Sequence, residues 1–460
     1  MAKKKNATNQ SRTPHSKQFL KFIASEWAES TKPLPVESEV APYAMARRDL
    51  VAKAFRGQVL LIEAGLPKVR SNDTDYRYRP STAFTHLTGW GSEAVPGSVL
   101  VIDARTKSPK STLYLLPTAG KDSDEFFANP AIGEFWVGQR PTLEEIEASL
   151  GIKTEDLSKL PKHRERFGKV LTEKSTKLRV FLSEMRFVKD DFEISEMRKA
   201  VATSILGFED IARNLKRAST HLRGERVVEG AFFSRARLEG NDLGYETIAA
   251  SGPNACILHW TKNDGPVKAG DLILVDAGVE VDSLYTADIT RTLPVNGKFS
   301  KEQLFVYQAV LEAADAAFAT AKPGVKFRDV HNAAMEVIAK KVAELGLIPL
   351  SAEEALKAEN QHHRRFMVHG TSHHLGLDVH DCAQARREMY QDGILKEGMV
   401  FTIEPGLYFH KDDLMVPEAY RGIGVRIEDD VLVTKDGVEN LSGALPREPE
   451  AVEAWLKNLL

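Results

Sequence analysis

Four acidic residues stand inside or directly beside apolar, strand-like runs of this chain, and they restrict its possible folds more than any other feature. Asp276 interrupts LILVDAG, Asp288 lies in TADITRT, Glu404 follows VFTI, and Glu428 lies in GVRIEDD. A buried carboxylate without a partner is costly, because burial disfavours its charged form. Any one of the four could pair with an arginine, or could point to solvent from a half-buried strand. Four together favour a fold that gathers them around a shared cation.

A strip rich in histidine lies between these acids. The segment HGTSHHLGLDVHD, residues 369–381, holds His369, His373, His374 and His380. Neutral imidazole is a common ligand of transition metals. His369 and His373 are four positions apart, but Gly370 stands where the zinc-protease helix motif requires glutamate, so that motif is excluded. The residues alone leave open which histidine binds a metal and which contact substrate or fill the core.

The combination of several carboxylates with one histidine predicts the class of metal. Hard, oxygen-rich donor sets suit Mn²⁺ or Co²⁺, with Zn²⁺ as an alternative, better than a cysteine-based structural zinc site. Such a set also exceeds what a single catalytic zinc ion takes from protein, which favours two neighbouring divalent ions bridged by carboxylates. Arg426 is two positions before Glu428 and therefore points to the same face of its strand, where it can orient a carboxylate.

Length and composition set the broad class. A chain of 460 residues exceeds what one hydrophobic core usually serves, so two domains are expected. The net charge of −3 argues against a nucleic-acid-binding surface and favours a small partner. The chain has only two cysteines, Cys256 and Cys382, and shows neither a secretory signal nor an apolar run of membrane-spanning length. We therefore expect a cytoplasmic protein that does not bind membranes.

Local patterns divide the chain into three parts. Residues 1–40 are basic and polar at the start and end in the proline-containing KPLPVESEVAP, which predicts a flexible extension. Residues 41–185 predict an α/β domain, because the helix-like ARRDLVAKAF precedes the strand-like runs VLLIEAG, SVLVIDA and STLYLLP. Residues 186–460 alternate helical and strand-like segments and predict an α+β domain.

Three helices of the second domain can be placed from their ends. A capping box at Asp190 and Glu193 begins a long helix with apolar residues every three or four positions, among them Met197, Phe208 and Leu215. Another helix begins at Ser300, with Gln303 three positions on, and a third runs from about Arg328 to Leu345 before Gly346. The strand-like runs are DLILVDAGVEV, TADITRTLPV, MVFTIEPGLYF and GVRIEDDVLVT, and a turn is expected at Asp436-Gly437.

The chemistry-bearing segments also stand in a recognisable order: NACILHW (254–260), VDAGVEVDSLYTADITRT (275–292), HGTSHHLGLDVHD (369–381), TIEPGLY (402–408) and RGIGVRIEDDVLVT (421–434). In this order and at these distances they resemble the metallopeptidases of the creatinase and methionine aminopeptidase fold, called the pita-bread fold. The chain is most similar to the Xaa-Pro aminopeptidases, also called aminopeptidase P. The segment DYRYRPSTAFTHLTGW (75–90) resembles their N-terminal domain, and the likeness covers residues 41–445.

The resemblance implies a dinuclear centre with five protein ligands: Asp276, Asp288, His373, Glu404 and Glu428. Asp288 and Glu428 would bridge the ions, Asp276 would hold one, and His373 with Glu404 would hold the other. One departure is the spacing between the two aspartates, 288 − 276 = 12, which is one residue longer than expected from the family. We expect the extra residue in the hairpin loop between them.

The resemblance also implies roles around the metals. His259, His369 and His380 would be substrate-site and catalytic histidines, Glu404 would carry protons, Tyr408 and Arg426 would support the site, and His374 would have no chemical role. The implied activity is removal of the first residue from peptides that have proline in second position. A dipeptidase for Xaa-Pro, and a metal-free binding protein on the same fold, are the alternatives. A homodimer or homotetramer is expected from the resemblance alone.

Overall fold

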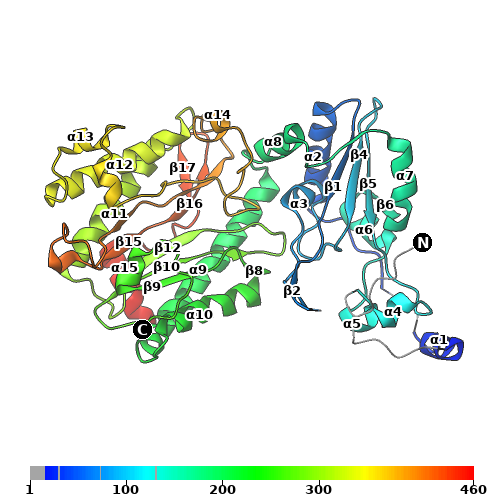
Figure 1. Cartoon of the computed structure of the whole chain (residues 1–460), viewed down its shortest axis with the longest axis horizontal. Coiled ribbons are helices and arrows are strands. Elements are labelled where there is room, and N and C mark those ends of the chain that lie inside the picture. The colour runs from blue at the N-terminus through cyan, green and yellow to red at the C-terminus, as the bar shows by residue number, and fades with distance from the viewer. Residues whose placement is uncertain (1–15, 29–31, 73, 130–131) are drawn as a thin grey trace. The chain divides into compact units, whose positions relative to one another are not determined.

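The computed structural model describes residues 16–28, 32–72, 74–129 and 132–460 (Figure 1). The chain divides into two compact units, with the boundary between Arg179 and Val180 inside helix α8 (Thr176–Glu184). We call them the N-terminal and the C-terminal unit and describe each by itself. No helix among the described residues is long and apolar enough to cross a membrane.

Helix α1 (Lys17–Ala24) lies in the segment that the sequence predicts to be a flexible extension, whereas residues 1–15 and 29–31 of that segment lie outside the described residues. The hydroxyl of Ser16 caps this helix by accepting a hydrogen bond from the backbone of Phe19 at 3.2 Å. The ring of Phe19 packs on that of Phe127, with 5.3 Å between ring centroids. The structure differs from the expectation at residues 17–24 because a cap and an aromatic contact outweigh the polar surroundings.

A five-stranded mixed sheet forms the centre of the N-terminal unit, in the order β6-β5-β4-β1-β7. Strands β1, β4 and β5 confirm the three predicted runs, and helix α2 confirms the predicted helix before them. Leu60 and Ile62 face one side of β1, and Val59 and Leu61 face the other, where they pack with residues of α7. The elements are α2 (Ala41–Ala54), β1 (Val59–Glu63), β2 (Val69–Ser71), β3 (Thr74–Asp75), α3 (Thr82–Thr88), β4 (Val99–Asp103), β5 (Lys110–Leu115), α4 (Asp124–Ala128), α5 (Glu134–Val137), α6 (Leu143–Leu150), β6 (Lys153–Asp156), η1 (Leu157–Lys159), α7 (Leu160–Phe167) and β7 (Val170–Leu171).

The C-terminal unit is built from short antiparallel sheets and two helix pairs. One sheet has the order β12-β10-β9 and another β13-β16-β17, and the ribbons β11-β8 and β14-β15 complete the set. The strands are β8 (Asp242–Leu243), β9 (Ile248–Ser251), β10 (Leu272–Ala277), β11 (Val279–Glu280), β12 (Ile289–Pro294), β13 (Val400–Ile403), β14 (Gly406–Tyr408), β15 (Gly424–Arg426), β16 (Asp429–Val433) and β17 (Val438–Asn440). The predicted turn at Asp436-Gly437 lies between β16 and β17.

The three predicted helices of this unit are present. The capping boxes at Asp190 and Ser300 begin α9 (Asp191–Ser219) and α11 (Lys301–Thr320), and Gly346 follows α12 (Phe327–Glu344) with a positive φ of 69°. Met197, Phe208 and Leu215 of α9 are buried as the apolar periodicity predicts. The remaining helices are α10 (Gly224–Glu239), η2 (Gly252–Cys256), α13 (Ala352–Leu356), η3 (His362–Arg365), α14 (Arg387–Tyr390), η4 (Glu418–Tyr420) and α15 (Pro449–Leu459).

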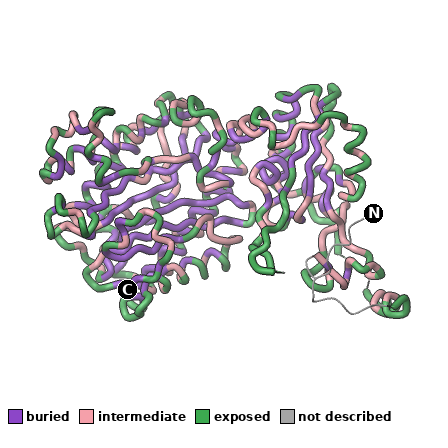
Figure 2. The backbone as a smooth tube through the Cα atoms, viewed as in Figure 1, coloured by how far each residue is buried: buried purple, intermediate pink, exposed green. Residues whose placement is uncertain are grey.

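The strands of the C-terminal unit are largely buried (Figure 2), and their apolar side chains divide between two clusters. Ile273 and Val275 of β10 pack in the cluster that contains α9 and α10, and Leu272 and Leu274 pack in the cluster that contains α11 and α12. Asp276 is on the same face as Leu272 and Leu274, two positions further along the strand. Strand alternation therefore turns a carboxylate inward where the apolar core ends.

Candidate metal centre

The four acids of the sequence come from two sheets that meet. Asp276 lies in β10 opposite Thr290 of β12, and Asp288 immediately precedes β12. Glu404 follows β13, and Glu428 separates β15 from β16. A backbone bridge between Thr290 and Glu428 joins the sheets at this point. Residues far apart in sequence are thus brought to one place by strand pairing.

The histidine strip lies along the edge of β13. The backbone N–H of Thr402 donates to the carbonyl of His373 at 2.9 Å, and that of Glu404 donates to Thr371 at 2.8 Å. His373 Nε2 is consequently 3.2 Å from Asp288, 3.5 Å from Glu404 and 4.0 Å from Glu428. One possible ligand atom from each of Asp288, His373 and Glu428 lies within 4.8 Å of the others. This spacing suits donors that share a cation.

A cavity of about 440 Å³ surrounds these donors. Its lining includes all five candidate ligands as well as the three histidines expected to contact substrate: Asp276, Asp288, His373, Glu404, Glu428, His259, His369 and His380. The ring of His380 meets that of His373 edge-on at 4.5 Å between centroids. The cavity size lies in the range of small-ligand sites.

Arg426 and Tyr408 connect the acids to the histidines. The guanidinium of Arg426 donates to Asp276 and, at 3.1 Å, to the hydroxyl of Tyr408, and it lies 3.9 Å from Glu428. The Tyr408 hydroxyl is 2.7 Å from His369 Nε2. Arg426 therefore orients two candidate ligands, as its position two residues before Glu428 predicts.

Burial and the crowding of negative charge strongly shift the pKa values of the acids. Burial and the charge of Asp276 raise the pKa of Asp288, although its contacts with His373 and Tyr245 act in the opposite direction. Burial likewise raises the pKa of Glu404 to about 7, and raises that of Glu428 well above its ordinary value. Burial alone would lower the pKa of His373, but its hydrogen bond to Asp288 and the nearby carboxylates raise it to about 9. The direction of these pKa shifts indicates that the site lacks positive charge to balance its carboxylates.

The hydrogen bonding of the candidate ligands also indicates that they suit a divalent metal ion. Asp276 Oδ1 is buried and accepts no hydrogen bond from any described residue, although its other oxygen is held by Arg426. A buried, unsatisfied carboxylate oxygen is rare without a missing partner. With an oxygen-rich donor set and the raised carboxylate pKa values beside it, a divalent cation would supply both the missing contact and the missing charge.

Comparison with known proteins decides the family. The model of metallopeptidase family M24 matches residues 195–435, and that of the aminopeptidase P N-terminal domain matches residues 43–178. This chain belongs to metallopeptidase family M24. Its resemblance to this fold, predicted from sequence, is confirmed.

The M24 chain is similar along almost its whole length to proteins named Xaa-Pro aminopeptidase. It is 46% identical to Xaa-Pro aminopeptidase 1 of Streptomyces coelicolor, over 96% of this chain and 93% of that protein. It is 33% identical to the Xaa-Pro aminopeptidase of Escherichia coli, over 89% and 96% of the two chains. The solved structure of Escherichia coli aminopeptidase P with the inhibitor Pro-Leu aligns with a TM-score of 0.79 at 29% identity, covering 92% of this chain and 99% of that one.

His374 of the M24 chain has a structural environment, as expected. Its ring stacks on Phe327 at 4.5 Å and meets Phe187 edge-on at 4.6 Å. Burial lowers the pKa of His374 to about 3 and keeps the ring neutral. It is a core residue beside the site.

Sequence reasoning missed several described residues that touch the candidate ligands, among them Tyr245 and Thr290. The hydroxyl of Tyr245 donates a hydrogen bond to Asp288, and burial raises the pKa of Tyr245 well above its ordinary value. Thr290 donates to Glu428 at 2.6 Å and accepts from Arg426 at 3.1 Å. Thr290 could have been found from its position, because it lies two residues after Asp288 and shares its strand face. Nothing near Tyr245 in the sequence indicates its role.

A buried ion cluster holds the loop that carries His380. Asp381 is fully buried and accepts hydrogen bonds from Arg186 at 2.8 Å and from Lys189 at 3.3 Å. Burial alone would raise the pKa of Asp381, but these two cations hold it well below its ordinary value. Gly376 lies so close to Asp381 and Lys189 that a Cβ there would collide with them. The cluster fixes the position of the residue directly after His380.

The metal-free protein is expected to lose thermal stability between about pH 7 and about pH 9. His373 drives this decline, because its pKa is raised to about 9 in the folded protein, and the stability that its proton contributes is lost as pH rises from the ordinary histidine value to the folded value. Glu404 acts in the same direction at lower pH, and its contribution is already lost near pH 7, its folded value. Buried histidines that stay neutral in the folded protein have the opposite effect, because they lower its stability as pH falls below about 6.5. The measurement therefore begins above that pH.

The measurement is thermal unfolding across this pH range in a chelator and again with Mn²⁺. Added metal should raise the melting temperature more at the alkaline end, where protons no longer compete for the ligands. The His373→Gln variant should show a shallower decline, because it removes the group that titrates in this range. A melting temperature that is constant or rises with pH would contradict the assignment.

Proposed function

We propose that this M24 protein is an aminopeptidase that hydrolyses the bond between the first residue of a peptide and a proline in second position. The observation that carries this function is the gathering of four carboxylates and His373 in one cavity walled by His259, His369 and His380. The relatives that match along nearly the whole chain are named Xaa-Pro aminopeptidases, so the dipeptidase alternative is not favoured. The presence of all five candidate ligands argues against a metal-free binding protein.

Five residues would hold two divalent ions: Asp276, Asp288, His373, Glu404 and Glu428. Asp288 and Glu428 come from opposite sheets, which suits carboxylates that bind both ions. Bound in this way, the ions would polarise the scissile carbonyl and acidify an attacking water. Arg426 would hold Asp276 and Glu428 in place through the contacts described above.

Glu404 is proposed as the residue that moves protons. Its carboxylate faces the cavity beside the other candidate ligands, where it can reach both an attacking water and the leaving nitrogen of a bound substrate. It would take a proton from the attacking water and deliver it to the leaving proline nitrogen. His373 Nε2, 3.5 Å away, limits where the carboxylate can point.

His369 and His380 are proposed to contact the reacting carbonyl as neutral rings. Burial and the nearby charge of Arg426 lower the pKa of His369 to about 4, and burial and His373 lower that of His380. A neutral imidazole has one ring N–H, which His380 would donate to a developing oxyanion without adding a charge that the metals would repel. The N–H of neutral His369 already points at the carbonyl of Gly370, 2.7 Å from Nδ1, so His369 would contact the substrate through its ring. His259, at the exposed rim, would wall the proline ring.

Proline in second position gives the substrate a distinctive shape. Its amide nitrogen carries no hydrogen, and its ring fixes φ, so a site that requires an N–H donor or a freer backbone rejects it. The apolar side chains of Ile248, Leu258 and Val379 line the same cavity and would contact the ring.

Mn²⁺ is proposed as the working metal, with Co²⁺ or Zn²⁺ as alternatives. Carboxylates supply most of the donors, and oxygen donors suit Mn²⁺ better than the cysteine-rich sites of structural zinc. Metal analysis of the purified protein, followed by chelation and addition of each ion separately, identifies it.

The substrate test compares matched peptides. A Xaa-Pro-Yaa tripeptide should be cleaved to release the first residue, and the Xaa-Ala-Yaa peptide should be cleaved at least about 100-fold less efficiently, because a pocket shaped for a pyrrolidine ring loses its contacts. Chelation should abolish turnover, and Mn²⁺ should restore it. Equal cleavage of the alanine peptide would contradict the proline specificity, and exclusive cleavage of Xaa-Pro dipeptides would restore the dipeptidase alternative.

We further propose a cytoplasmic location and a homodimeric or homotetrameric state. Cys256 and Cys382 are both free and buried, which suits a reducing compartment. The oligomeric state rests on the family resemblance and is measured by light scattering of the purified protein. Peptides are the proposed partners, without nucleic acid or membrane.

A further inference from the structure

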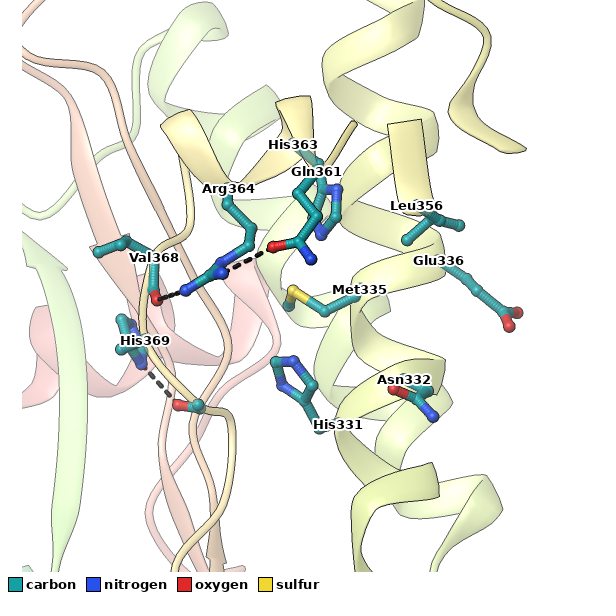
Figure 3. A pocket seen from close by; sticks show the side chains of 11 residues that line it. His331, Asn332, Met335, Glu336, Leu356, Gln361, His363, Arg364, Val368 and His369 are labelled. Carbon is teal, nitrogen blue, oxygen red and sulfur yellow. Dashed lines mark hydrogen bonds between the residues drawn. The ribbon is translucent and has the colours of Figure 1, made fainter. Parts of the chain in front are cut away.

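A second cavity, of about 560 Å³, lies beside the metal centre (Figure 3). One wall is α12, with His331 and Met335, and the other is the segment from Leu356 to Gly370. His369 and Gly370 line both this cavity and the one that contains the acids. The two spaces therefore meet at His369, which we have placed at the reacting carbonyl.

The guanidinium of Arg364 in this cavity has no counter-ion among the described residues. It donates to the side chain of Gln361 at 2.7 Å and to the carbonyl of Val368 at 3.4 Å, both neutral groups (Figure 3). Within the described ranges, no carboxylate lies at ion-pair distance from it. The next residue, Arg365, is different, because it pairs with both oxygens of Asp413 at 2.8 and 2.9 Å. Arg364 is thus a preformed, uncommitted cation with further N–H groups to donate.

His331 adds a neutral donor to the same space. Its Nδ1 accepts a hydrogen bond from the backbone N–H of Thr371 at 3.3 Å, which places the ring hydrogen on Nε2. Among the described residues, no partner contacts Nε2, so it is available to donate. Burial, together with the charges of His363 and Arg364, lowers the pKa of His331, which shows that the cavity disfavours further positive charge.

The rest of the lining suits a peptide. Met335, Leu356 and Val368 supply apolar surface, and Asn332 and Gln361 supply amides that can pair with a peptide backbone. Glu336, the carboxylate of the lining, points away from the guanidinium of Arg364 at the far side of the cavity (Figure 3). The cavity therefore offers apolar and amide contacts to a peptide, and it favours an anion near Arg364.

We propose that this cavity receives the part of a short peptide that follows the proline, and that Arg364 binds its terminal carboxylate. The inference rests on the proposed aminopeptidase function, in which the chain after the proline must leave the metal centre. Because His369 and Gly370 line both cavities, a chain that passes these two residues enters the second cavity. A terminal carboxylate has the charge and the planar two-oxygen geometry that a guanidinium binds best. Short peptides with a free carboxyl end are therefore the preferred substrates.

The test measures kcat and KM for Xaa-Pro peptides of three to five residues, each as free acid and as C-terminal amide. For peptides long enough to reach Arg364, the wild-type protein should have a lower KM for the free acid than for the C-terminal amide. Arg364→Ala should raise KM for that acid about 10- to 100-fold, the effect expected for a lost hydrogen bond to a charged group, with kcat and the amide nearly unchanged. Arg364→Lys should restore part of the preference.

Arg365→Ala is the matched control, because it removes the neighbouring arginine whose charge is committed to Asp413. It should leave the values for acids and amides unchanged. The inference is overturned if no length shows an acid preference that Arg364→Ala removes, or if that variant affects acid and amide equally. Absence of cleavage of every Xaa-Pro peptide by the wild-type protein would instead refute the proposed function. Inhibition by the product peptide, as acid and as amide, provides a binding measurement that does not depend on turnover.

Discussion

Replacement of Glu404 by glutamine is expected to lower kcat on a Xaa-Pro peptide by at least about 1,000-fold while the protein stays folded. Glutamine preserves the shape of the side chain but cannot accept a proton. The fold should lose no stability, because burial raises the pKa of Glu404 to about 7 and its charge therefore opposes folding of the metal-free protein. Steady-state kinetics of the metal-loaded protein and thermal unfolding of the metal-free protein measure the two effects separately.

His373→Ala should cause a comparable loss of turnover, because it removes the one imidazole among the candidate ligands. Glu397→Gln, at an exposed position shortly before β13, is the control and should keep full activity. More than a tenth of wild-type turnover in either site variant would refute its assignment. Bound metal, counted in each purified variant, distinguishes loss of a ligand from loss of a proton carrier.

Asp381→Asn is expected to destabilise the C-terminal unit by about 3–5 kcal/mol, the cost of breaking a buried ion pair and leaving its cations uncompensated. Arg186 and Lys189 are both buried, and both form ion pairs with this carboxylate. Asparagine keeps the size of the side chain but not its charge. Denaturant unfolding gives the free energy change, and activity at low temperature shows whether His380 is still held in position.

The control for this effect is an ion pair at the surface. Arg198 and Glu439 have side chains that are 47% and 40% exposed, and Glu439→Gln should cost no more than about 1 kcal/mol. A loss of less than about 1 kcal/mol in Asp381→Asn would mean that water or a shifted neighbour replaces the carboxylate, contrary to the burial described here.

Local signals in the sequence were sufficient for three helices and four strand-forming segments of the C-terminal unit, whereas α10, α15 and the shorter elements were not predicted. Asp190 with Glu193, and Ser300 with Gln303, predict helix starts that the structure contains, because a capping box depends only on residues within one turn. The acids of the site were conspicuous because their charge conflicts with the apolar strands around them. The structure confirms that such conflicts mark the place where the strands converge.

Features that depend on distant partners could not be predicted in this way. Asp381 meets Lys189 across 192 positions, and nothing near either residue indicates the other. The same holds for Tyr245 and Asp288, and for the cavity beside Arg364, whose walls come from α12 and from a separate loop. Helix α1 was missed for the same reason, because Phe19 packs against Phe127, which is far away in the sequence.

The division of the acids between two sheets also sets an order of events during synthesis. Asp276 and Asp288 leave the ribosome well before Glu404 and Glu428, since 404 − 288 = 116 residues separate the inner pair. A nascent chain with the first sheet alone offers too few donors to retain an ion against competing chelators. Capture of the ions should therefore come last, when β13 and β16 join the bridge at Thr290. A chain halted before residue 428 lacks Glu428, so the complete set of candidate ligands exists only once nearly all of the C-terminal unit has been synthesised.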